Sequence, residues 1–509
     1  MKKVMGDASN FSGTKALVVG LGDTGASCVR WLVERDATVR GTDSREEPPH
    51  AQRLREAFPE VALSLGGFQA EDFAWADLVV VSPGVALATP EVAAAVATGK
   101  DVVGDVELFA RTIRGSSAKV IAITGSNGKS TVTALAGHLC AAYGLDTVVA
   151  GNIGLPVLEA LEERETQGKA PDVWVLELSS FQLETTRNLE ADAATVLNIS
   201  QDHMDRYAGL EEYAAAKTRV FGVETDLGRA KPSCIQVLNR DDPLVMTMAR
   251  PGHTLWTFGI ESECADQEAL PTGHYCLMHQ KDRLWMTEAG QGLLPVDKLP
   301  IAGLHNAANA MAALALCRGI GLDYDGLIPA LKTFEGLPHR VQRVAELADR
   351  IFYDDSKGTN VGATVAALKG FTVPVVLIAG GDGKGQDFSP MKDAVGNVRA
   401  VVQIGRDGPH IEAAVAGICP VYRAESMEAA VNQAYRLSRP GDAVLLSPAC
   451  ASWDMFRNYA HRAEVFVAAV ETLAARSGER RFGERRKDNS RIVYPDRRQG
   501  ERRRAGHVS

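Results

Sequence analysis

Short apolar runs alternate along the chain with stretches in which apolar residues recur at helical spacing. Near the start, residues 15–20, 38–42 and 78–81 have the length and the bounding turn residues of buried strands. Each run is followed by a segment with helical periodicity. Because this alternation is typical of βαβ units, we expect parallel sheets covered by helices almost throughout the chain.

The alternation continues through two further blocks. A helix is predicted at 306–318, and strands are predicted at 173–178, 194–199, 375–379, 400–404 and 443–446. A chain of 509 residues is too long for a single hydrophobic core. We therefore expect three α/β domains and a tail, at residues 1–114, 115–337, 338–476 and 477–509.

The composition is that of an ordinary globular protein, with 45% hydrophobic and 23% charged residues. The first residues are not followed by the apolar region of a signal peptide, and no run reaches the length of a membrane span. The eight cysteines are scattered without a CxxC pair, which favours reduced thiols. We expect a cytoplasmic protein that does not insert into membranes.

Charge is distributed unevenly. The chain has a net charge of −9, yet residues 477–509 hold ten arginines and one lysine against five acidic residues. This tail repeats GERR and has few apolar residues, so we expect it to be disordered. A solvated extension is the favoured interpretation, and an arm for RNA, anionic lipid or another anionic partner is the alternative. The acidic body argues against nucleic acid as the main substrate.

The segment IAITGSNGKSTVT, residues 121–133, has the order of a phosphate-binding loop: an apolar run, a glycine-rich loop and a helix-compatible stretch. Lys129 provides a positive charge for the β- and γ-phosphates, and the Ser130 hydroxyl can bind Mg²⁺. Ile123 stands where the standard Walker loop has glycine, so the match is to the shorter TGxxGK[ST] form. The segment predicts binding of a nucleoside triphosphate.

A second glycine-rich loop follows the first predicted strand. Gly20, Gly22 and Gly25 fit GxGxxG, and Asp43 lies at the end of the next strand, as in a Rossmann dinucleotide fingerprint. The third strand ends in Ser82-Pro83-Gly84. The fingerprint predicts a pyrophosphate at the helix N-terminus and does not specify which nucleotide carries it.

Polar groups follow strands of the middle block. Glu177 ends a strand in LELSSFQLE, where its carboxylate is well placed to bind Mg²⁺. His203 lies in the cluster NISQDHMDR, and its acidic neighbours favour a metal-binding or catalytic role over an ordinary turn histidine. Lys217, in EEYAAAKTRVF, reads from spacing alone as a surface lysine. A lysine near Mg²⁺ can alternatively react with CO₂ to give a carbamate, an oxygen ligand for a hard metal.

The third block contains DDSKGTN, GGDGK and SPACAS, each at or after a predicted strand. Cys450 invites interpretation as a nucleophile, but no histidine is placed by the sequence as its base, and buried structural cysteines are common. Lysines and small hydroxyl residues that converge on strand ends favour recognition of carboxylates instead.

Together, TGSNGKST, GNIGLP, LELSSFQLE, DHMDRY, GLPHR, DDSKGTN, GGDGK and SPACAS closely resemble the Mur ligase family, over residues 13 to 473. The resemblance implies a Rossmann-like UDP-binding domain, a central P-loop-type ATPase domain with a parallel sheet, and a Rossmann-like C-terminal domain that binds an amino acid. It implies ATP-dependent addition of D-glutamate to UDP-N-acetylmuramoyl-L-alanine in cytoplasmic peptidoglycan synthesis. A monomer that requires no nucleic acid is expected.

The resemblance also implies roles for individual residues. Those for ATP are Gly125, Asn127, Gly128, Lys129, Ser130, Thr131, Asn306, Asn309, Arg340 and Asp355. Those for the UDP substrate are Asp23, Thr24, Asp43, Ser44, Arg45, Ser82, Gly84 and Asn152. Those for D-glutamate are Thr359, Lys384, Ser452 and Tyr459. Ser130 and Glu177 would bind one Mg²⁺, His203 and a carbamylated Lys217 a second, and Lys129, His203, Lys217 and Lys357 would be catalytic.

Three positions depart from the family pattern. Trp453 stands where leucine is common, Tyr459 where phenylalanine is common, and Asp23 places an acid in the loop that would face a diphosphate. We expect the ligase reaction to pass through an acyl phosphate, which hydrolyses in water. We therefore also expect the third domain to close over the site by rotation about a hinge near residues 336–338.

Other functions are consistent with parts of the sequence. A sister ligase or a folate-polyglutamate synthase would share the middle domain. An NAD-dependent dehydrogenase would explain the GLGDTG loop and Asp43, but not the phosphate loop, Glu177 or DHMDRY. A non-catalytic scaffold would use the arginine-rich tail to recruit partners.

Overall fold

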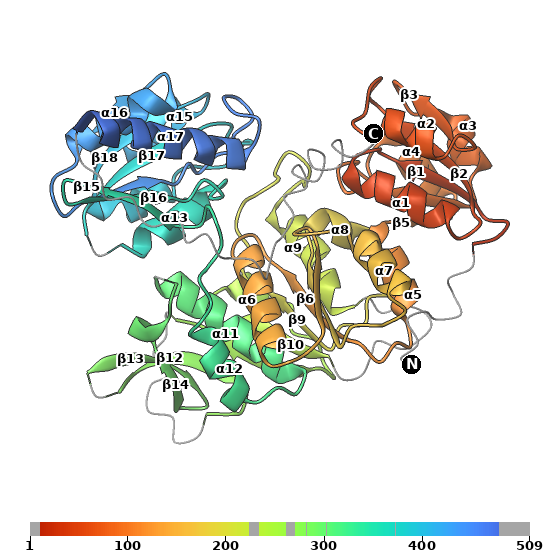
Figure 1. Ribbon diagram of the computed structural model, residues 1–509, viewed down its shortest axis with the longest axis horizontal. Helices are drawn as coiled ribbons and strands as arrows, with labels where there is room; N and C mark the ends of the chain where they lie inside the picture. Colours follow the sequence, from red (N-terminus) through yellow and green to blue (C-terminus); the bar gives the residue numbers. More distant parts are fainter. Residues whose placement is uncertain are drawn as a thin grey trace, which may run out of the picture.

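The computed structural model describes residues 11–222, 234–260, 270–280, 282–301, 303–371 and 373–477. Three β-sheets, each with its own helices, follow one another along the chain (Figure 1). The expected three-domain α/β architecture is therefore confirmed. The tail beyond residue 477, for which we expected disorder, lies outside the described residues.

The N-terminal sheet is parallel, with strand order β3-β2-β1-β4-β5. This is the order of a doubly wound Rossmann-like sheet, and its topological switch point lies between β1 and β4. The strands are β1 (Lys15–Val19), β2 (Thr38–Asp43), β3 (Ala62–Leu65), β4 (Leu78–Val81) and β5 (Asp101–Val103). The helices are α1 (Asp23–Val33), α2 (Ala51–Ala57), α3 (Ala70–Trp75), α4 (Pro90–Ala97) and α5 (Asp105–Ile113).

The central sheet has nine strands in the order β14-β13-β12-β11-β10-β9-β6-β8-β7. Its strands are β6 (Lys119–Thr124), β7 (Thr147–Gly151), β8 (Val173–Glu177), β9 (Ala193–Val196), β10 (Ile235–Asn239), β11 (Thr254–Phe258), β12 (His274–Gln280), β13 (Arg283–Glu288) and β14 (Gln291–Pro295). Its helices are α6 (Lys129–Ala142), α7 (Val157–Thr166), α8 (Ser180–Glu184), α9 (Leu210–Thr218), α10 (Pro243–Met246), α11 (Leu304–Gly319) and α12 (Tyr324–Leu331).

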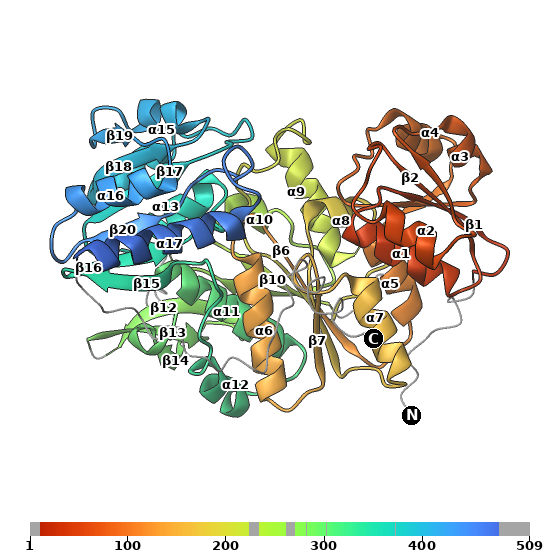
Figure 2. The same ribbon diagram turned by 45° about the horizontal axis from the view of Figure 1, so that its top comes forward.

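The C-terminal sheet has the order β15-β16-β20-β17-β18-β19, and α17 lies along it (Figure 2). Its strands are β15 (Gln342–Leu347), β16 (Arg350–Asp354), β17 (Val375–Gly380), β18 (Val398–Ile404), β19 (Val421–Arg423) and β20 (Ala443–Leu446). Its helices are α13 (Val361–Lys369), α14 (Met391–Ala394), α15 (Gly408–Val415), α16 (Met427–Leu437) and α17 (Tyr459–Ser477).

The expectation of parallel strands almost throughout is wrong at two places. Strands β12, β13 and β14 form an antiparallel meander at one edge of the central sheet, and β15 pairs antiparallel with β16. These strands follow one another through short turns without an intervening helix, so no crossover connection can make them parallel. The meander lies at the opposite edge of the sheet from β7.

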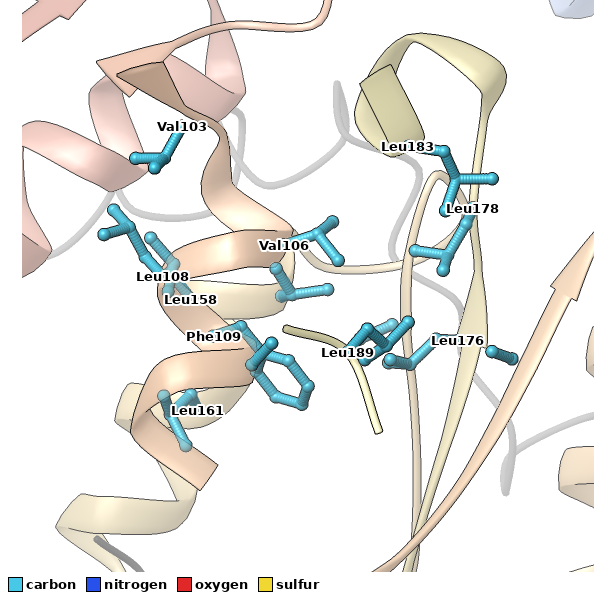
Figure 3. Packing of buried hydrophobic residues seen from close by; sticks show 14 of the residues in the cluster. Val103, Val106, Leu108, Phe109, Leu158, Leu161, Leu176, Leu178, Leu183 and Leu189 are labelled. Carbon is cyan, nitrogen blue, oxygen red and sulfur yellow. The ribbon is translucent and has the colours of Figure 1, made fainter. Parts of the chain in front are cut away.

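The N-terminal and central domains share one hydrophobic core. Helix α5 packs against α7, and its Phe109 ring meets the Trp174 ring of β8 edge to face at 5.0 Å. Val106, Leu158 and Leu176 belong to the same buried cluster (Figure 3). The C-terminal domain has separate clusters on the two faces of its sheet. Among the described residues, one buried cluster therefore spans the first two domains, whereas the clusters of the third domain contain only its own residues.

Two further expectations can be compared with the structure. In the part of the chain that the structure describes, no helix is long and apolar enough to cross a membrane. Six of the cysteines in the described segments are free, including the buried Cys450, but Cys276 on β12 is disulfide-bonded, against the expectation of reduced thiols only.

Candidate active site

The phosphate loop connects β6 to α6 and needs glycine at two positions. Gly125 and Gly128 have φ values of +146° and +84°. A Cβ atom on Gly128 would lie 2.6 Å from Asn309 Oδ1, and one on Gly125 would lie 3.0 Å from the Leu197 side chain. The positive φ angles and the close approach both exclude larger residues. The loop therefore holds its backbone against α11 and the end of β9.

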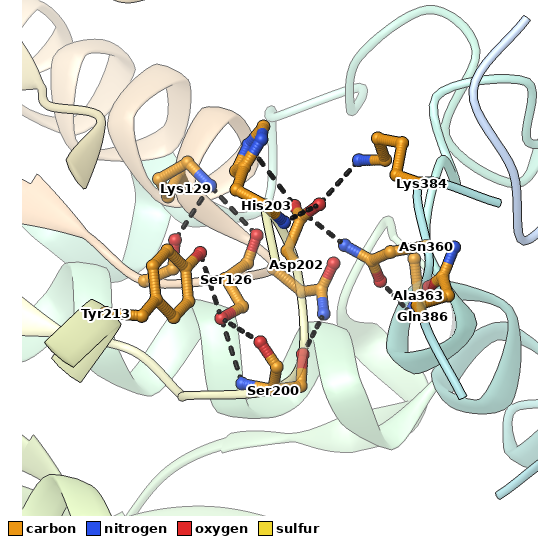
Figure 4. A network of polar contacts seen from close by, with 12 residues as sticks. Ser126, Lys129, Ser200, Asp202, His203, Tyr213, Asn360, Ala363, Lys384 and Gln386 are labelled. Carbon is orange, nitrogen blue, oxygen red and sulfur yellow. Dashed lines mark hydrogen bonds and ion pairs between the residues drawn. The ribbon is translucent and has the colours of Figure 1, made fainter. Parts of the chain in front are cut away.

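The loop is held in place by residues that follow β9. Asn127 donates its backbone N–H to Asn198 Oδ1 at 2.8 Å and its side-chain amide to Ser200 Oγ at 3.2 Å. The Ser126 hydroxyl donates to the Ser200 carbonyl at 3.0 Å and lies 3.3 Å from the Tyr213 hydroxyl (Figure 4). These bonds fix the loop before any phosphate binds, as a preorganised site requires.

Lys129 begins α6 and curls back over the loop. Its ammonium donates to the carbonyl oxygens of Gly125 and Ser126 at 2.7 and 2.9 Å. Burial lowers the pKa of Lys129, while the nearby carboxylates of Glu177 and Asp202 act in the opposite direction. The charge therefore lies at the centre of the loop, where a bound phosphate would replace the carbonyl partners. The next residues, Ser130 and Thr131, are buried.

Glu177 ends β8 beside this loop, and its side chain is buried. Asn152, after β7, donates its side-chain amide to Glu177 Oε1 at 2.7 Å. Among the described residues, Glu177 Oε2 is buried without a hydrogen-bond partner. A buried, unpartnered carboxylate oxygen is costly unless a ligand uses it. Together with the buried Ser130 hydroxyl, it supplies the hard oxygen donors that Mg²⁺ prefers.

His203 and Lys217 both lie within electrostatic reach of Lys129. His203 has φ of +58°, and its ring packs on Phe181 with centroids 4.7 Å apart. Burial is the main cause that lowers its pKa to about 4, so the imidazole is neutral near pH 7. Lys217 is not the surface residue that its spacing suggested: it is 1% exposed on α9, and its ammonium donates to the Gly125 carbonyl at 2.9 Å. Burial, and secondarily the charge of Lys129, lowers its pKa well below the ordinary value.

Residues from α11 and the start of the C-terminal domain face the phosphate loop. Asn309 donates to Asn306 Oδ1 at 3.2 Å, and Arg340 Nη2 lies 3.5 Å from Ser130 Oγ. Asp355 is buried just after β16, where Ser447 donates to it at 2.7 Å. Burial raises the pKa of Asp355 to about 7. The residues expected to bind ATP thus meet at the junction of two domains.

The residues expected to bind D-glutamate line the C-terminal side of the same junction. Lys357 Nζ lies 5.4 Å from the centre of the Tyr459 ring, and burial lowers the pKa of Lys357 to about 8. Thr359 follows in the same loop, donating its N–H to the Lys357 carbonyl at 2.9 Å. Pairing between Asp382 and Ala451 brings the loops of Lys384 and Ser452 together. The Lys384 ammonium forms an ion pair with Asp202 of the central domain.

The residues expected to bind the UDP substrate gather at the carboxyl edge of the N-terminal sheet. Asp43 accepts the Leu21 N–H at 2.7 Å, and although burial opposes ionisation, hydrogen bonds from Arg45 and from backbone N–H groups lower its pKa. Ser82 donates to the Gly20 carbonyl at 2.7 Å. Thr24 lies in the first turn of α1, and Ser44 and Gly84 are exposed at the same edge. Asp23 Oδ1 lies 2.8 Å from His50 Nε2.

Sequence reasoning missed three residues that organise the site. Arg462 on α17 is fully buried and donates to the carbonyl oxygens of Ser356 and Cys450. Arg206 donates to the Pro83 carbonyl at 2.7 Å and so joins the UDP-site loop to the central domain. Asp202 is the first residue of the DHMDRY motif, but the sequence assigns it no role of its own. Arg206 could have been found from that motif, but nothing in the sequence around Arg462 marks it as buried.

Models of three related domains match the chain in order. They are the Mur ligase MurD-like N-terminal domain at residues 14–104, the Mur ligase middle domain at 123–317 and the Mur ligase glutamate ligase domain at 339–450. The first match covers the GxGxxG loop, which decides against a dinucleotide-dependent dehydrogenase.

Two similar proteins that align over almost their whole length carry the same name. The chain is 55% identical to a UDP-N-acetylmuramoylalanine–D-glutamate ligase of Thiobacillus denitrificans, over 93% of this chain and 99% of that protein. It is 54% identical to one of Chromobacterium violaceum, over 92% and 99%. Among solved structures, the MurF ligase of Thermotoga maritima in complex with ADP shares the fold, with a TM-score of 0.56 and 15% identity over 94% of this chain and 100% of that one. The chain belongs to the Mur ligase family, and within it to the UDP-N-acetylmuramoylalanine–D-glutamate ligases.

Proposed function

We propose that the protein is an ATP-dependent ligase that joins D-glutamate to UDP-N-acetylmuramoyl-L-alanine in peptidoglycan precursor synthesis. The observation that best supports this proposal is the set of residues at the junction of the central and C-terminal domains. A phosphate loop, an unpartnered carboxylate oxygen at Glu177 and the lysines of both domains meet there. The relatives, which align over almost their whole length, are named for this activity.

In the first step, the alanyl carboxylate of the UDP substrate attacks the γ-phosphate of ATP and gives an acyl phosphate and ADP. Two anions must approach each other, so the site needs concentrated positive charge. Lys129 supplies it at the loop, and Lys357 and Arg340 supply it from the C-terminal domain. Gly125, Asn127, Gly128 and Thr131 would position the phosphates by their backbone and side-chain groups, and Asn306, Asn309 and Asp355 would contact the nucleotide.

In the second step, the amine of D-glutamate attacks the acyl carbon, and phosphate leaves. Thr359, Lys384, Ser452 and Tyr459 would bind the carboxylates of D-glutamate. Asp23, Thr24, Asp43, Ser44, Arg45, Ser82 and Gly84 would hold the uridine diphosphate at the N-terminal sheet edge. The shared core of the first two domains supports a fixed distance between this anchor and the phosphate loop.

The residues present fit two Mg²⁺ ions. Glu177 and Ser130 provide oxygen donors for one, and neutral His203 together with a carbamate on Lys217 would hold the other. Bound Mg²⁺ would neutralise phosphate charge during transfer. Among the described residues, no group of three His, Cys, Asp or Glu side chains is placed to hold a metal ion by itself. The cytoplasmic location, the monomeric state and an anionic partner for the tail remain parts of this proposal.

The test is product formation by the full-length protein with ATP, Mg²⁺ and UDP-N-acetylmuramoyl-L-alanine. D-glutamate, L-glutamate, L-lysine and diaminopimelate are offered in turn, with phosphate release and product mass as readouts. We expect phosphate release and a product heavier by one glutamyl residue with D-glutamate only. Turnover with another amino acid would assign a sister activity, and no turnover would contradict the assignment of the acyl substrate.

A further inference from the structure

Asp202 links the central and C-terminal domains through its carboxylate (Figure 4). Its Oδ1 accepts from Lys384 Nζ at 2.5 Å, and its Oδ2 accepts from Asn360 Nδ2 at 3.4 Å. The chain thus places a carboxylate of one domain directly on an ammonium of the other.

This ion pair conflicts with the role proposed for Lys384 in binding D-glutamate. The proposed function assigns the Lys384 ammonium to a carboxylate of D-glutamate, but in the free protein that ammonium is held by Asp202. At 2.5 Å, no group fits between the two charges. D-glutamate must therefore separate them, and separation leaves a largely buried carboxylate in need of a new cationic partner.

D-glutamate itself carries a cation that could pair with Asp202, namely its ammonium group. We propose that the Asp202–Lys384 pair is the docking site for the zwitterionic end of the amino acid, whose carboxylate takes Lys384 and whose ammonium takes Asp202. This inference rests on the proposed function and adds the group that binds the amine. When D-glutamate binds, Lys384 exchanges the Asp202 carboxylate for the carboxylate of the ligand, and Asp202 exchanges the Lys384 ammonium for the ammonium of the ligand. Each of the two side chains therefore keeps a partner of opposite charge. The flexible Lys384 side chain can move to admit the ligand, and Asn360 can stay on Asp202.

The arrangement also points the amine in the productive direction. Asp202 precedes His203, and its charge acts on Lys129, so it lies on the phosphate-loop side of the junction. An ammonium held there faces the domain in which the acyl phosphate forms. Two other buried carboxyl groups nearby are otherwise engaged, since Glu177 is oriented by Asn152 and Asp355 accepts from Ser447.

The experiment compares steady-state KM values of the full-length enzyme and an Asp202→Asn variant. Asparagine keeps the shape of the side chain and an oxygen for the His203 N–H. Loss of a charged hydrogen bond should raise the KM for D-glutamate about 10- to 100-fold, with little change in the KM for ATP or the UDP substrate. Asp202→Glu should recover part of the loss. Asp205→Asn is the matched control, because Asp205 lies in the same loop and is exposed.

Glutarate, which is glutamate without its amine, distinguishes ammonium binding from mere positioning of Lys384. We expect Asp202→Asn to leave inhibition by glutarate unchanged or to strengthen it. Equal weakening of D-glutamate and glutarate, or an unchanged KM for D-glutamate, would overturn the inference. Should Asp202→Asn fail to fold, the Asp202→Glu enzyme and the wild type compared on both ligands still decide it. A wild-type enzyme that forms no product with D-glutamate would instead contradict the proposed function.

Discussion

Asn152 holds Glu177 at two points. Its side-chain amide donates to Glu177 Oε1 at 2.7 Å, and its backbone N–H donates to the Glu177 carbonyl oxygen at 2.8 Å. Gly151, just before it, has φ of +110°, and a Cβ there would lie 2.3 Å from the same carbonyl oxygen. The turn after β7 therefore fixes the Glu177 carboxylate so that Oε2 alone is left to a ligand.

The first prediction follows from this contact. Asn152→Ala should raise the Mg²⁺ concentration for half-maximal activity by about 10- to 100-fold, because a residue that orients a metal ligand controls metal affinity. The measurement is a Mg²⁺ titration of phosphate release. Asn432→Ala, on the surface of α16, is the control. If only the KM for the UDP substrate rises, Asn152 contacts that substrate and does not act through Glu177.

Lys129 should be the largest single contributor of charge from the protein to phosphoryl transfer. Lys129→Ala should lower kcat by about 10²- to 10³-fold, the usual cost of removing one preorganised electrostatic group. The thermal unfolding midpoint shows whether the variant is folded, and Lys392→Ala, on exposed α14, serves as control. A reduction of less than tenfold would mean that another cation neutralises the γ-phosphate.

Asp355 should make stability depend on pH. Burial raises its pKa from 3.8 to about 7, so the folded chain keeps this proton up to about pH 7, while the unfolded chain loses it near pH 4. Between these values rising pH favours unfolding. Asp355→Asn cannot ionise, so its stability relative to the wild type should increase from pH 4 to pH 7 and then stay constant.

The measurement is urea or thermal unfolding without nucleotide over that pH range. Asp393→Asn, at an exposed position of α14, controls for loss of one carboxylate. Parallel profiles of the wild type and Asp355→Asn would show that Asp355 is ionised in the folded protein.

The carbamate on Lys217 predicts a chemical signature as well as a kinetic one. Formation requires a neutral amine to attack CO₂, and burial keeps the pKa of Lys217 well below the ordinary value. With ¹³C-labelled CO₂, the wild type should show a carbamate resonance that Lys217→Ala lacks. The variant should be inactive and partly restored by small carboxylate anions. Lys332→Ala, at an exposed position, is the control, and an active Lys217→Ala enzyme would exclude the carbamate.

Local pattern predicted much of the fold. Residues 78–81 and 443–446 are strands β4 and β20 at the expected bounds, because a short apolar run between turn residues has few other solutions. Glu177 could be placed because the carboxyl ends of parallel strands share one edge. The Asp202–Lys384 pair could not be placed, since its partners are 182 residues apart and meet only through the packing of two domains. Arg462 reads as an ordinary helix arginine, and only tertiary structure shows that it is buried.

The two domain junctions differ in ways that predict how the protein moves. The N-terminal and central domains share a core and are tied by Arg30 to Glu162 at 2.8 Å and by Arg206 to the Pro83 carbonyl. The C-terminal domain contacts the central one through polar pairs such as Asp202 with Lys384 and Asn360. Polar contacts exchange with water at low cost, whereas separating a shared core exposes apolar surface to water and is costly.

We therefore expect the C-terminal domain to rotate as a rigid body while the first two domains stay together, about a hinge near residues 336–338. Gly336 has φ of +83°, a conformation that glycine adopts without strain. Small-angle scattering of the full-length protein should change when ATP and the UDP substrate are added together. Gly336→Ala should reduce turnover, because alanine resists that conformation. Gly396→Ala should not, because the added Cβ would meet no atom within 4 Å. Identical scattering curves with and without ligands would contradict domain rotation, and the water exclusion that the acyl phosphate needs would then have to come from a site that is already closed.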